Sequence, residues 1–491
     1  MKLTRNLRAA VGVTVIASLS CFSFGGTATA ASDPQIDELK AEIRVLMQRV
    51  DQLEKEKAHP PAAAPAPTPV ATPSAKAPVA VPGGGPGIAT VQAPVVEGPA
   101  SPIAPRDAFN DQQQAAPRPD DLTLDPKYLG FIAVPNTPVM IKFNAKPRVD
   151  ATYDNKNAGD DDRFVTAKIP VTGDPAKGGD GTFNINAKGS QLRVDVRAPS
   201  VAGSPRFYYE NDFFGSGGGE FNYRVRHLYG QIYNIIVGQT YSVFEDPDIW
   251  PDTLDYEGPS SAIFARRPLI RYQYRFDDQW QVNLGLEQPS SEIDTTNQND
   301  SAASGHSQAP DGGFNVRWES ASIGHVQLAT MFRDLGVTGP VVGNHTAFGW
   351  GLNLTGGFNT FGRDSVQTEL TYGQGIFHFV NDNFANLDAA FDRSGNLQPL
   401  PYFGVMLGYT HHWSELLRTT LSYGFTDVDN AFSQDGDAYH QAHYASVNLM
   451  WQIRKRLTVG LEELYGYKKT NDGSEGDVFR TQLGLVYSIF D

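Results

Sequence analysis

From about residue 139 onward the chain repeats strand-length segments in which apolar and polar side chains alternate. The clearest of these is PLIRYQYRF, residues 268–276. Successive side chains of a β-strand point to opposite faces, so an alternating segment has one apolar face and one polar face. Here Tyr272 and Tyr274 lie on the apolar face, and Arg271 and Arg275 lie on the polar face. This period of two predicts a chain built mainly of β-strands that have one apolar face and one polar face.

The connections between these segments are sorted by length. Short turns alternate with longer polar loops, as in outer-membrane barrels, and a soluble sandwich would not sort its connections in this way. Four tryptophans near the short turns, Trp280, Trp318, Trp413 and Trp451, match an interfacial aromatic girdle. The sequence therefore predicts an all-β fold, a 16-stranded antiparallel transmembrane β-barrel. Its expected strands are residues 139–151, 189–198, 205–213, 222–233, 235–243, 268–276, 280–287, 312–321, 324–333, 346–357, 363–373, 402–412, 416–425, 440–452, 456–467 and 478–490.

The N-terminal part of the chain has a different composition and pattern. Residues 1–30 combine a basic start, an apolar stretch and an A-x-A site, which is typical of a secretory signal peptide. Residues 31–57 carry a short heptad pattern that predicts a coiled coil. Residues 58–120 are rich in Pro and Ala and predict an extended periplasmic linker. The expected barrel occupies residues 121–491.

Composition removes several classes of function. The chain carries a formal net charge of −15, which disfavours nucleic acid as a partner. Its single cysteine, Cys21, falls in the expected signal peptide, so thiol catalysis and cysteine-based metal sites are excluded. After Ala30 no stretch approaches the roughly 20 apolar residues of a membrane helix. A closed barrel is the remaining way for such a chain to span a membrane.

The polar faces of the first six expected strands are strongly basic. They place ten cations and four acids inward, whereas the later strands balance four cations with four acids. This excess favours attraction of anions into a wet lumen; the alternative is a structural lattice of salt bridges. The ten cations are Lys142, Lys146, Arg148, Arg193, Arg197, Arg206, Arg224, Arg226, Arg271 and Arg275.

The third long loop supplies the opposite charge. Its sequence FEDPDIWPDTLDYEGPSSAIFA contains six acids and no Lys or Arg, and its prolines and Trp250 favour a stiff loop. We expect this loop to fold inward and narrow the pore, with its acids facing the basic strands across a transverse field. The alternative is an anionic outer rim. The expected constriction acids are Asp246, Asp248, Asp252 and Asp255, with Glu245 and Glu257 beside them.

Other motifs are weak. The acidic stretch 154–163 could hold calcium, but Lys156 breaks the EF-hand pattern and a solvated loop is the favoured interpretation. The stretch SGHS, residues 304–307, lacks an orienting acid, so it does not define a hydrolase. His411 and His412 have no companions at metal-ligand spacing. The sequence therefore predicts no catalytic residue, no metal site and no cofactor, and a protein that is not an enzyme.

The whole arrangement resembles the DcaP-type trimeric porins of Gram-negative outer membranes. The stretches RVRHLYGQIYNIIVGQTYSVFEDPD, residues 224–248, and FARRPLIRYQYRF, residues 264–276, carry the resemblance. It implies a homotrimer that admits small anions, especially dicarboxylates, through an arginine-rich constriction. The residues it carries over are Arg224, Arg226, Arg266, Arg267, Arg271 and Arg275. The C-terminus departs from the usual barrel ending, because Ile489 stands where Phe is expected after Gly484 and Tyr487.

Three classes of function remain open at this stage. The first is a porin for small anionic solutes, with membrane lipids and lipopolysaccharide as its surroundings. A sugar- or phosphate-selective porin is the close rival. The third is a structural tether whose N-terminal segment contacts the cell wall, which would not explain the basic strands.

Overall fold

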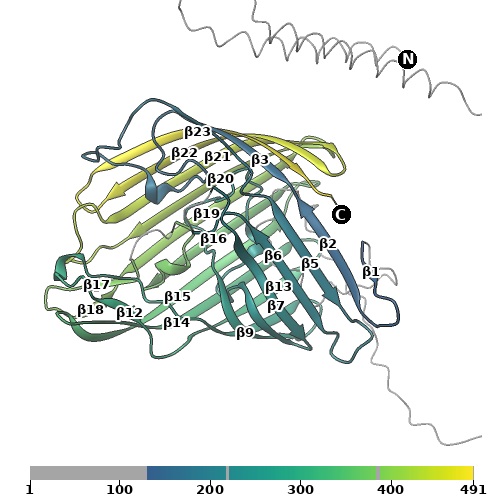
Figure 1. Cartoon of the computed structure of the whole chain (residues 1–491), viewed down its shortest axis with the longest axis horizontal. Helices are drawn as coiled ribbons and strands as arrows, with labels where there is room; N and C mark the ends of the chain where they lie inside the picture. The colour runs from purple at the N-terminus through teal and green to yellow at the C-terminus, as the bar shows by residue number, and fades with distance from the viewer. Residues whose placement is uncertain (1–129, 217–219, 383–386, 490–491) are drawn as a thin grey trace, which may run out of the picture. The chain divides into compact units, whose positions relative to one another are not determined.

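The computed structural model describes residues 130–216, 220–382 and 387–489. Within them, large antiparallel strands form one 20-stranded sheet, and a three-stranded sheet lies among the loops (Figure 1). The expected signal peptide, coiled coil and linker, residues 1–30, 31–57 and 58–120, lie outside the described residues. No helix in the described ranges is long and apolar enough to cross a membrane. The all-β prediction is confirmed.

The strands follow the alternating segments of the sequence closely. The first half of the chain contains β1 (Ile132–Ala133), β2 (Met140–Lys146), β3 (Arg148–Asp154), β4 (Thr182–Asn186), β5 (Gln191–Arg197), β6 (Arg206–Asp212), β7 (Arg224–Ile232), β8 (Ile235–Tyr241), β9 (Arg266–Arg275), β10 (Trp280–Glu287), β11 (Ile293–Asp294), β12 (Ser304–His306) and β13 (Asp311–Ser320). The second half contains β14 (Gly324–Gly339), β15 (Gly343–Asn359), β16 (Ser365–Gln374), β17 (Ala389–Phe391), β18 (Leu397–Pro399), β19 (Pro401–His412), β20 (Leu417–Val428), β21 (Tyr439–Arg454), β22 (Leu457–Thr470) and β23 (Glu475–Tyr487). Short 3₁₀ turns lie in the loops: η3 (Thr166–Lys168), η4 (Pro247–Ile249), η5 (Thr296–Gln298) and η6 (Phe377–Phe379).

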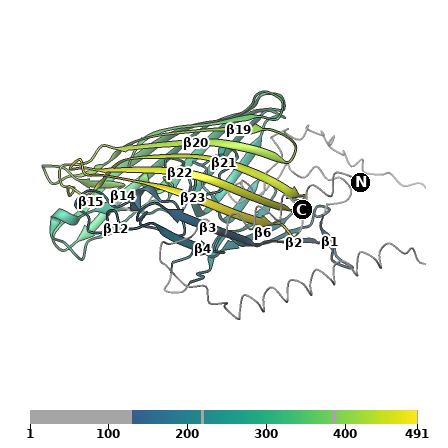
Figure 2. The ribbon, with the colours of Figure 1, turned by 90° about the horizontal axis from the view of Figure 1, so that it is seen from above.

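The large sheet returns on itself. Each long strand pairs antiparallel with its neighbours, and the last strand, β23, pairs with β3 near the start. Pro147 separates β2 from β3, and the next stretch of chain pairs with both, β5 with β2 and β4 with β3. Figure 2 shows β19 to β23 running side by side toward this junction. The sheet is therefore a closed barrel, without the long unpaired edges of an open sheet.

The two faces of the barrel wall have opposite chemistry. In β9 the tyrosines Tyr272 and Tyr274 are exposed, whereas Arg271 and Arg275 are partly covered on the other face. The same division recurs around the wall, with exposed Phe, Leu, Val and Tyr outside and buried Arg, Asp, Glu, Asn and Thr inside. An apolar outer surface of this kind is what hydrocarbon requires of a membrane barrel.

The strands differ from the prediction in three places. Residues 334–345, expected as a long loop, are strand, because β14 continues to Gly339 and β15 restarts at Gly343. The second long strand begins with β4, inside the expected loop 152–188. The third difference is a β-bulge in β7, since Glu210 pairs with His227 and the next residue, Asn211, pairs with Val225. The bulge leaves both Arg226 and His227 buried.

Candidate functional site: an arginine-lined cavity

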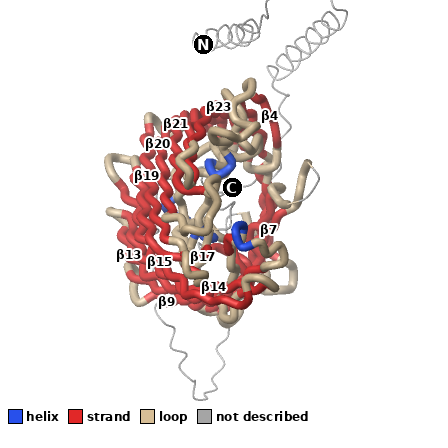
Figure 3. The backbone as a smooth tube through the Cα atoms, turned by 90° about the vertical axis from the view of Figure 1, so that its left-hand side faces the viewer, coloured by secondary structure: helices blue, strands red, loops and turns tan. Residues whose placement is uncertain are grey.

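The inner loop, residues 242–265 between β8 and β9, lies against the inside of the barrel. Asp246 accepts hydrogen bonds from Arg317 at 3.0 Å and from Thr355 at 2.6 Å, and it pairs with His325 at 2.9 Å. These partners come from β13, β14 and β15, far from the loop in sequence. The loop itself is buried, with Trp250 and Leu254 fully covered. Figure 3 shows loop segments and short helical turns inside the ring of strands.

Two further acids of the inner loop pair with arginines of later strands. Asp248 pairs with Arg317 at 2.8 Å, and Asp252 pairs with Arg418 at 2.5 Å. Asp255 accepts hydrogen bonds from the backbone N–H groups of Gly258 and Phe164. The expectation that these acids face the basic early strands is wrong, because each is used to fasten the loop. A carboxylate that is removed from water is costly unless another group pairs with it. Each buried acid of the inner loop therefore has a partner that holds the loop in place.

Glycines on the inner wall make room for the inner loop. A Cβ built on Gly408 of β19 would lie 2.9 Å from the ring of Pro251. At Gly460 of β22 the corresponding atom would lie 3.3 Å from Leu254. Since real Cβ atoms rarely approach so closely, these glycines provide the space the loop occupies. The inner loop therefore packs directly against the inner face of β19 and β22.

An apolar core joins the inner loop to the loop after β16. Phe244 and Ile263 of the inner loop pack with Ile376, Phe377 and other residues of the loop after β16. This loop, residues 374–401, was expected to be polar, and that expectation is wrong. A second cluster joins Phe164 and Ile169 of loop 152–188 to the walls of β21 to β23. The side of the lumen next to β13–β22 is therefore filled by packed loops.

The basic strands carry a network of shared ion pairs. Asp195 pairs with both Arg197 and Arg206 at 2.8 and 2.9 Å. Glu210 pairs with Arg193 and Arg226, and Asp212 pairs with Arg224 and Arg226. Arg148 pairs with Asp150 and also donates to the Leu254 carbonyl of the inner loop. Five of the predicted arginines are thus part of a lattice in which each acid serves two arginines, and Arg148 pairs with an acid of its own. Lys142, Lys146 and Arg275 lie on the same strands and have partners as well.

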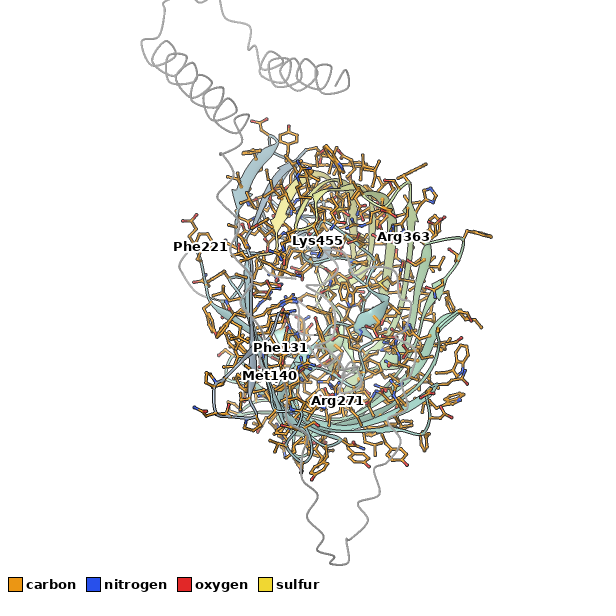
Figure 4. All side chains as sticks on the ribbon, turned by 90° about the vertical axis from the view of Figure 1, so that its right-hand side faces the viewer. Phe131, Met140, Phe221, Arg271, Arg363 and Lys455 are labelled. Carbon is orange, nitrogen blue, oxygen red and sulfur yellow. The ribbon has the colours of Figure 1, made fainter. Side chains whose placement is uncertain are left out.

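Three predicted arginines have no acidic partner. Arg266, Arg267 and Arg271 of β9 form no ion pair within the described chain, and Arg271, labelled in Figure 4, reaches only the Tyr241 carbonyl at 3.5 Å. The Arg266 guanidinium lies 4.8 Å from the ring centre of Phe264. Arg267 donates to the Gln288 carbonyl at 2.9 Å. These three side chains therefore keep a positive charge that no carboxylate neutralises directly.

A cavity of about 220 Å³ lies where the inner loop approaches β9. Four arginines line it, and Glu257 is the one acid among its lining residues. Arg163 pairs with Glu257 at 3.2 Å, and the Asn381 side chain donates to the Glu257 carbonyl at 2.8 Å. The lining residues are Arg163, Arg224, Tyr256, Glu257, Phe264, Ala265, Arg266, Arg267, His378, Val380 and Asn381.

The loops around the cavity are joined by buried carboxylates. Asp382 accepts hydrogen bonds from Thr166 at 2.5 Å, from the Ala167 N–H at 3.0 Å and from Tyr439 at 3.0 Å. Burial raises the pKa of Asp382 to about 6, and burial likewise raises the pKa of Asp255 to about 6. These two groups connect loop 152–188, the inner loop and the loop after β16.

Sequence reasoning missed part of the cavity wall. Arg163, His378 and Asn381 come from loops that carry no alternating pattern, so their inward position has no local signal. Arg163 stood in the acidic stretch 154–163, whose aspartates form ion pairs: Asp160 with Lys168 and Asp162 with Lys188. No three His, Cys, Asp or Glu side chains gather as a metal site anywhere in the described ranges.

A closed barrel with an apolar exterior, a polar interior and a loop folded against its inner wall is the architecture of an outer-membrane porin. Proteins of this class are channels rather than enzymes. The DcaP outer membrane protein family matches residues 132–489, and the chain belongs to that family. No curated protein matches the sequence.

One solved structure supports the fold, and two further matches have lower scores. The outer membrane channel DcaP of Acinetobacter baumannii is 21% identical, with a TM-score of 0.65, and the match covers 74% of this chain and 100% of that one. An anion-selective porin from Comamonas acidovorans is 13% identical, with a TM-score of 0.46, over 72% of this chain and 100% of that one. OmpT, an outer membrane protein of Vibrio cholerae, is 10% identical, with a TM-score of 0.47, over 73% of this chain and 100% of that one.

Proposed function

We propose that this porin admits small anionic solutes by passive diffusion past the arginine-lined cavity. The observation that carries the proposal is the set Arg266, Arg267 and Arg271, three inward cations of β9 with no carboxylate partner. Buried or half-buried charge without a counter-ion is costly, and an entering anion supplies the missing partner. In this proposal the solute passes the arginine-lined cavity between the inner loop and β9.

Dicarboxylates are the solutes this arrangement favours. The cavity holds arginines from three separate segments: Arg163 from a loop, Arg224 from β7, and Arg266 with Arg267 from β9. Guanidinium groups bind carboxylates in a planar, bidentate way, so cations on separated walls suit a molecule with a carboxylate at each end. The resemblance to DcaP-type porins supports the same class of solute.

The pairings and the resemblance support a proposal for the assembly. Counting β2 with β3 and β4 with β5 as single interrupted strands, the wall consists of sixteen membrane-spanning strands. The barrel sits in the Gram-negative outer membrane among lipids and lipopolysaccharide as a homotrimer. Its N-terminal coiled coil and linker extend into the periplasm, within reach of the cell wall.

Planar-bilayer recording of the purified full chain tests the proposal. In a salt gradient the zero-current potential should have the sign of an anion-selective channel, and succinate should block chloride current at lower concentration than acetate. Phosphate and glucose serve as the probes for the rival porin classes. A cation-selective or strictly neutral potential would refute the anion mechanism. Stronger block by phosphate or glucose than by succinate would reassign the solute, and absence of conductance would favour the tether.

A further inference from the structure

The outer face of the barrel contains one residue that does not fit a lipid-facing surface. On the side formed by β9 to β15, the exposed side chains in mid-strand are large and apolar, such as Ile270, Leu284, Leu328 and Leu352. On β22 the outward face instead carries Glu463, which is exposed and stands at the middle of the strand. Among the strands of the described chain, no other exposed charged side chain lies away from a strand end.

Glu463 has apolar neighbours on both sides. It pairs across the sheet with Val447 of β21 and with Thr481 of β23. Leu461 and Leu483 lie close by, and both are about half exposed. The Thr481 hydroxyl lies within hydrogen-bond distance of both Glu463 carboxylate oxygens, at 2.9 and 3.0 Å, and in the described structure Thr481 is the one side chain that donates to Glu463. The carboxylate therefore keeps most of its acceptor capacity unused within an apolar band.

A charge on the hydrocarbon-facing side of a barrel is destabilising, most strongly near the bilayer midplane. The cost disappears if another protein surface covers the charge and supplies hydrogen bonds. Small side chains next to Glu463 suit such a contact, since Ala445 of β21 and Ala151 of β3 lie on the same outward face. Small residues let neighbouring backbones approach closely inside a membrane.

The same face also offers a donor. Tyr465 stands two residues after Glu463 on β22 and points to the same side of the sheet. Its ring packs on Phe479, with ring centroids 4.9 Å apart, and its hydroxyl makes no hydrogen bond within the described residues. The acceptor and the donor are different groups on one face, so the acceptor of one copy can meet the donor of the next copy around a closed ring.

We infer that the outward face of β21, β22, β23 and β3, centred on Glu463, docks a second copy of this chain. The contact covers Glu463 and brings a hydroxyl such as that of Tyr465 from the neighbouring copy within hydrogen-bond reach. Membrane proteins with closed symmetry bury such patches between subunits. The inference names the partner surface for the assembly proposed above, and it does not depend on which solute passes through the barrel.

Lipid accessibility tests the location directly. Because Cys21 is the only cysteine, Thr481→Cys and the control Leu284→Cys can each be labelled with a fluorophore in a Cys21→Ser background. In proteoliposomes with nitroxide-labelled lipids, we expect loss of quenching at position 481 and strong quenching at position 284. Equal, strong quenching at both positions would overturn the inference.

Native mass spectrometry of the full chain in detergent tests the partner. We expect the parent to be oligomeric and Glu463→Leu to shift it to monomers while remaining heat-modifiable on gels; Glu463→Gln, which keeps the size and an acceptor, should stay oligomeric. An oligomer unchanged by Glu463→Leu, with lipid reaching position 481, places the interface elsewhere and leaves the proposed trimer standing. A monomeric parent refutes both the interface and the trimer, and protection of position 481 in such a monomer points to a different protein as the partner.

Discussion

Replacing the two unpaired arginines of the cavity wall tests the proposed anion path most directly. The variant is Arg266→Gln with Arg267→Gln, which removes two positive charges from the cavity and keeps side chains of similar reach. Neither arginine has a carboxylate partner in the described chain, so the change leaves no acid newly unpaired. The barrel should therefore fold normally.

The size of the effect follows from Coulomb's law. An anion about 5 Å from a guanidinium gains about 3 kcal/mol at an effective dielectric of 20 and just under 1 kcal/mol in bulk water. Loss of the two charges thus raises the energy of a passing anion by about 2–6 kcal/mol. Since about 1.4 kcal/mol is a factor of ten, the blocking affinity of a dianion should fall at least tenfold. Salt near 1 M, where the Debye length is about 3 Å, should reduce the difference from the parent.

The assay is the zero-current potential in a salt gradient, combined with succinate block. Arg363→Gln is the matched control, because Arg363 lies in the turn before β16 and does not line the cavity. We expect the double variant to lose most anion preference and the control to match the parent. Suppose the double variant folds, conducts and keeps the parent's potential. The unpaired arginines would then not govern permeation, and the reasoning from missing counter-ions would be wrong.

Three further outcomes follow from the way the loops are fastened. Gly408→Val should push Pro251 away from the wall into the lumen and lower single-channel conductance, because a β-carbon has no room between the wall and the loop. Asp252→Ala should lower the free energy of unfolding by about 3 kcal/mol in a denaturant titration, since it leaves the buried Arg418 without that acid. Asp382 has a folded pKa of about 6, above its unfolded value, so its stabilising contribution is complete below about pH 4 and is lost as the pH rises through 6. The protection factor of the Ala167 amide, which corrects for the intrinsic pH dependence of exchange, should therefore be higher at pH 5 than at pH 8, and Asp382→Asn should remove that difference.

Each of these outcomes has a control or a refuting result. Gly312 of β13 has only Leu286 within 4 Å of a built Cβ, at 3.6 Å, so Gly312→Val should leave the conductance unchanged. Equal conductance in both glycine variants would mean that the inner loop does not limit the pore. An unaltered unfolding midpoint for Asp252→Ala would show that its ion pair does not fasten the loop. A protection factor at Ala167 that is the same at both pH values would exclude Asp382 as the titrating group.

The strands were predictable because the bilayer imposes a pattern on adjacent residues. Where lipid faces one side and water or polar groups face the other, as in β9, alternation in the sequence is direct evidence of the fold. The pattern changes phase in the upper part of β14. There Leu335 and Val337 turn inward to pack on the small sheet of β11, β17 and β18, while Asp334 faces out. That reversal is why residues 334–345 were predicted as a loop.

The loop contacts were not predictable in the same way. Asp246 meets Arg317, 71 residues further along the chain, and neither position has a local signal that names the other. Counting charges correctly predicts an excess of cations on the early strands. The count assumes, however, that each acid neutralises one arginine. Shared carboxylates such as Asp195 and Glu210 alter that arithmetic, and only the geometry identifies Arg266 and Arg267 as unpartnered.

The junction between β3 and β23 has a consequence for how the protein forms. Asp154 pairs with Arg480 across it at 2.6 Å, and these residues are 326 positions apart in sequence. Every other neighbouring pair of long strands is joined through a connection far shorter than that. Because loop-closure entropy grows with sequence separation, we expect the pairing of β3 with β23 to form last. Before it forms, the chain is a curved sheet with two open edges. During that interval both edges present unpaired N–H and C=O groups, which invite pairing with other chains. Rapid docking of the terminal strands, rather than formation of the hairpins, should therefore decide how much newly made protein reaches its native state.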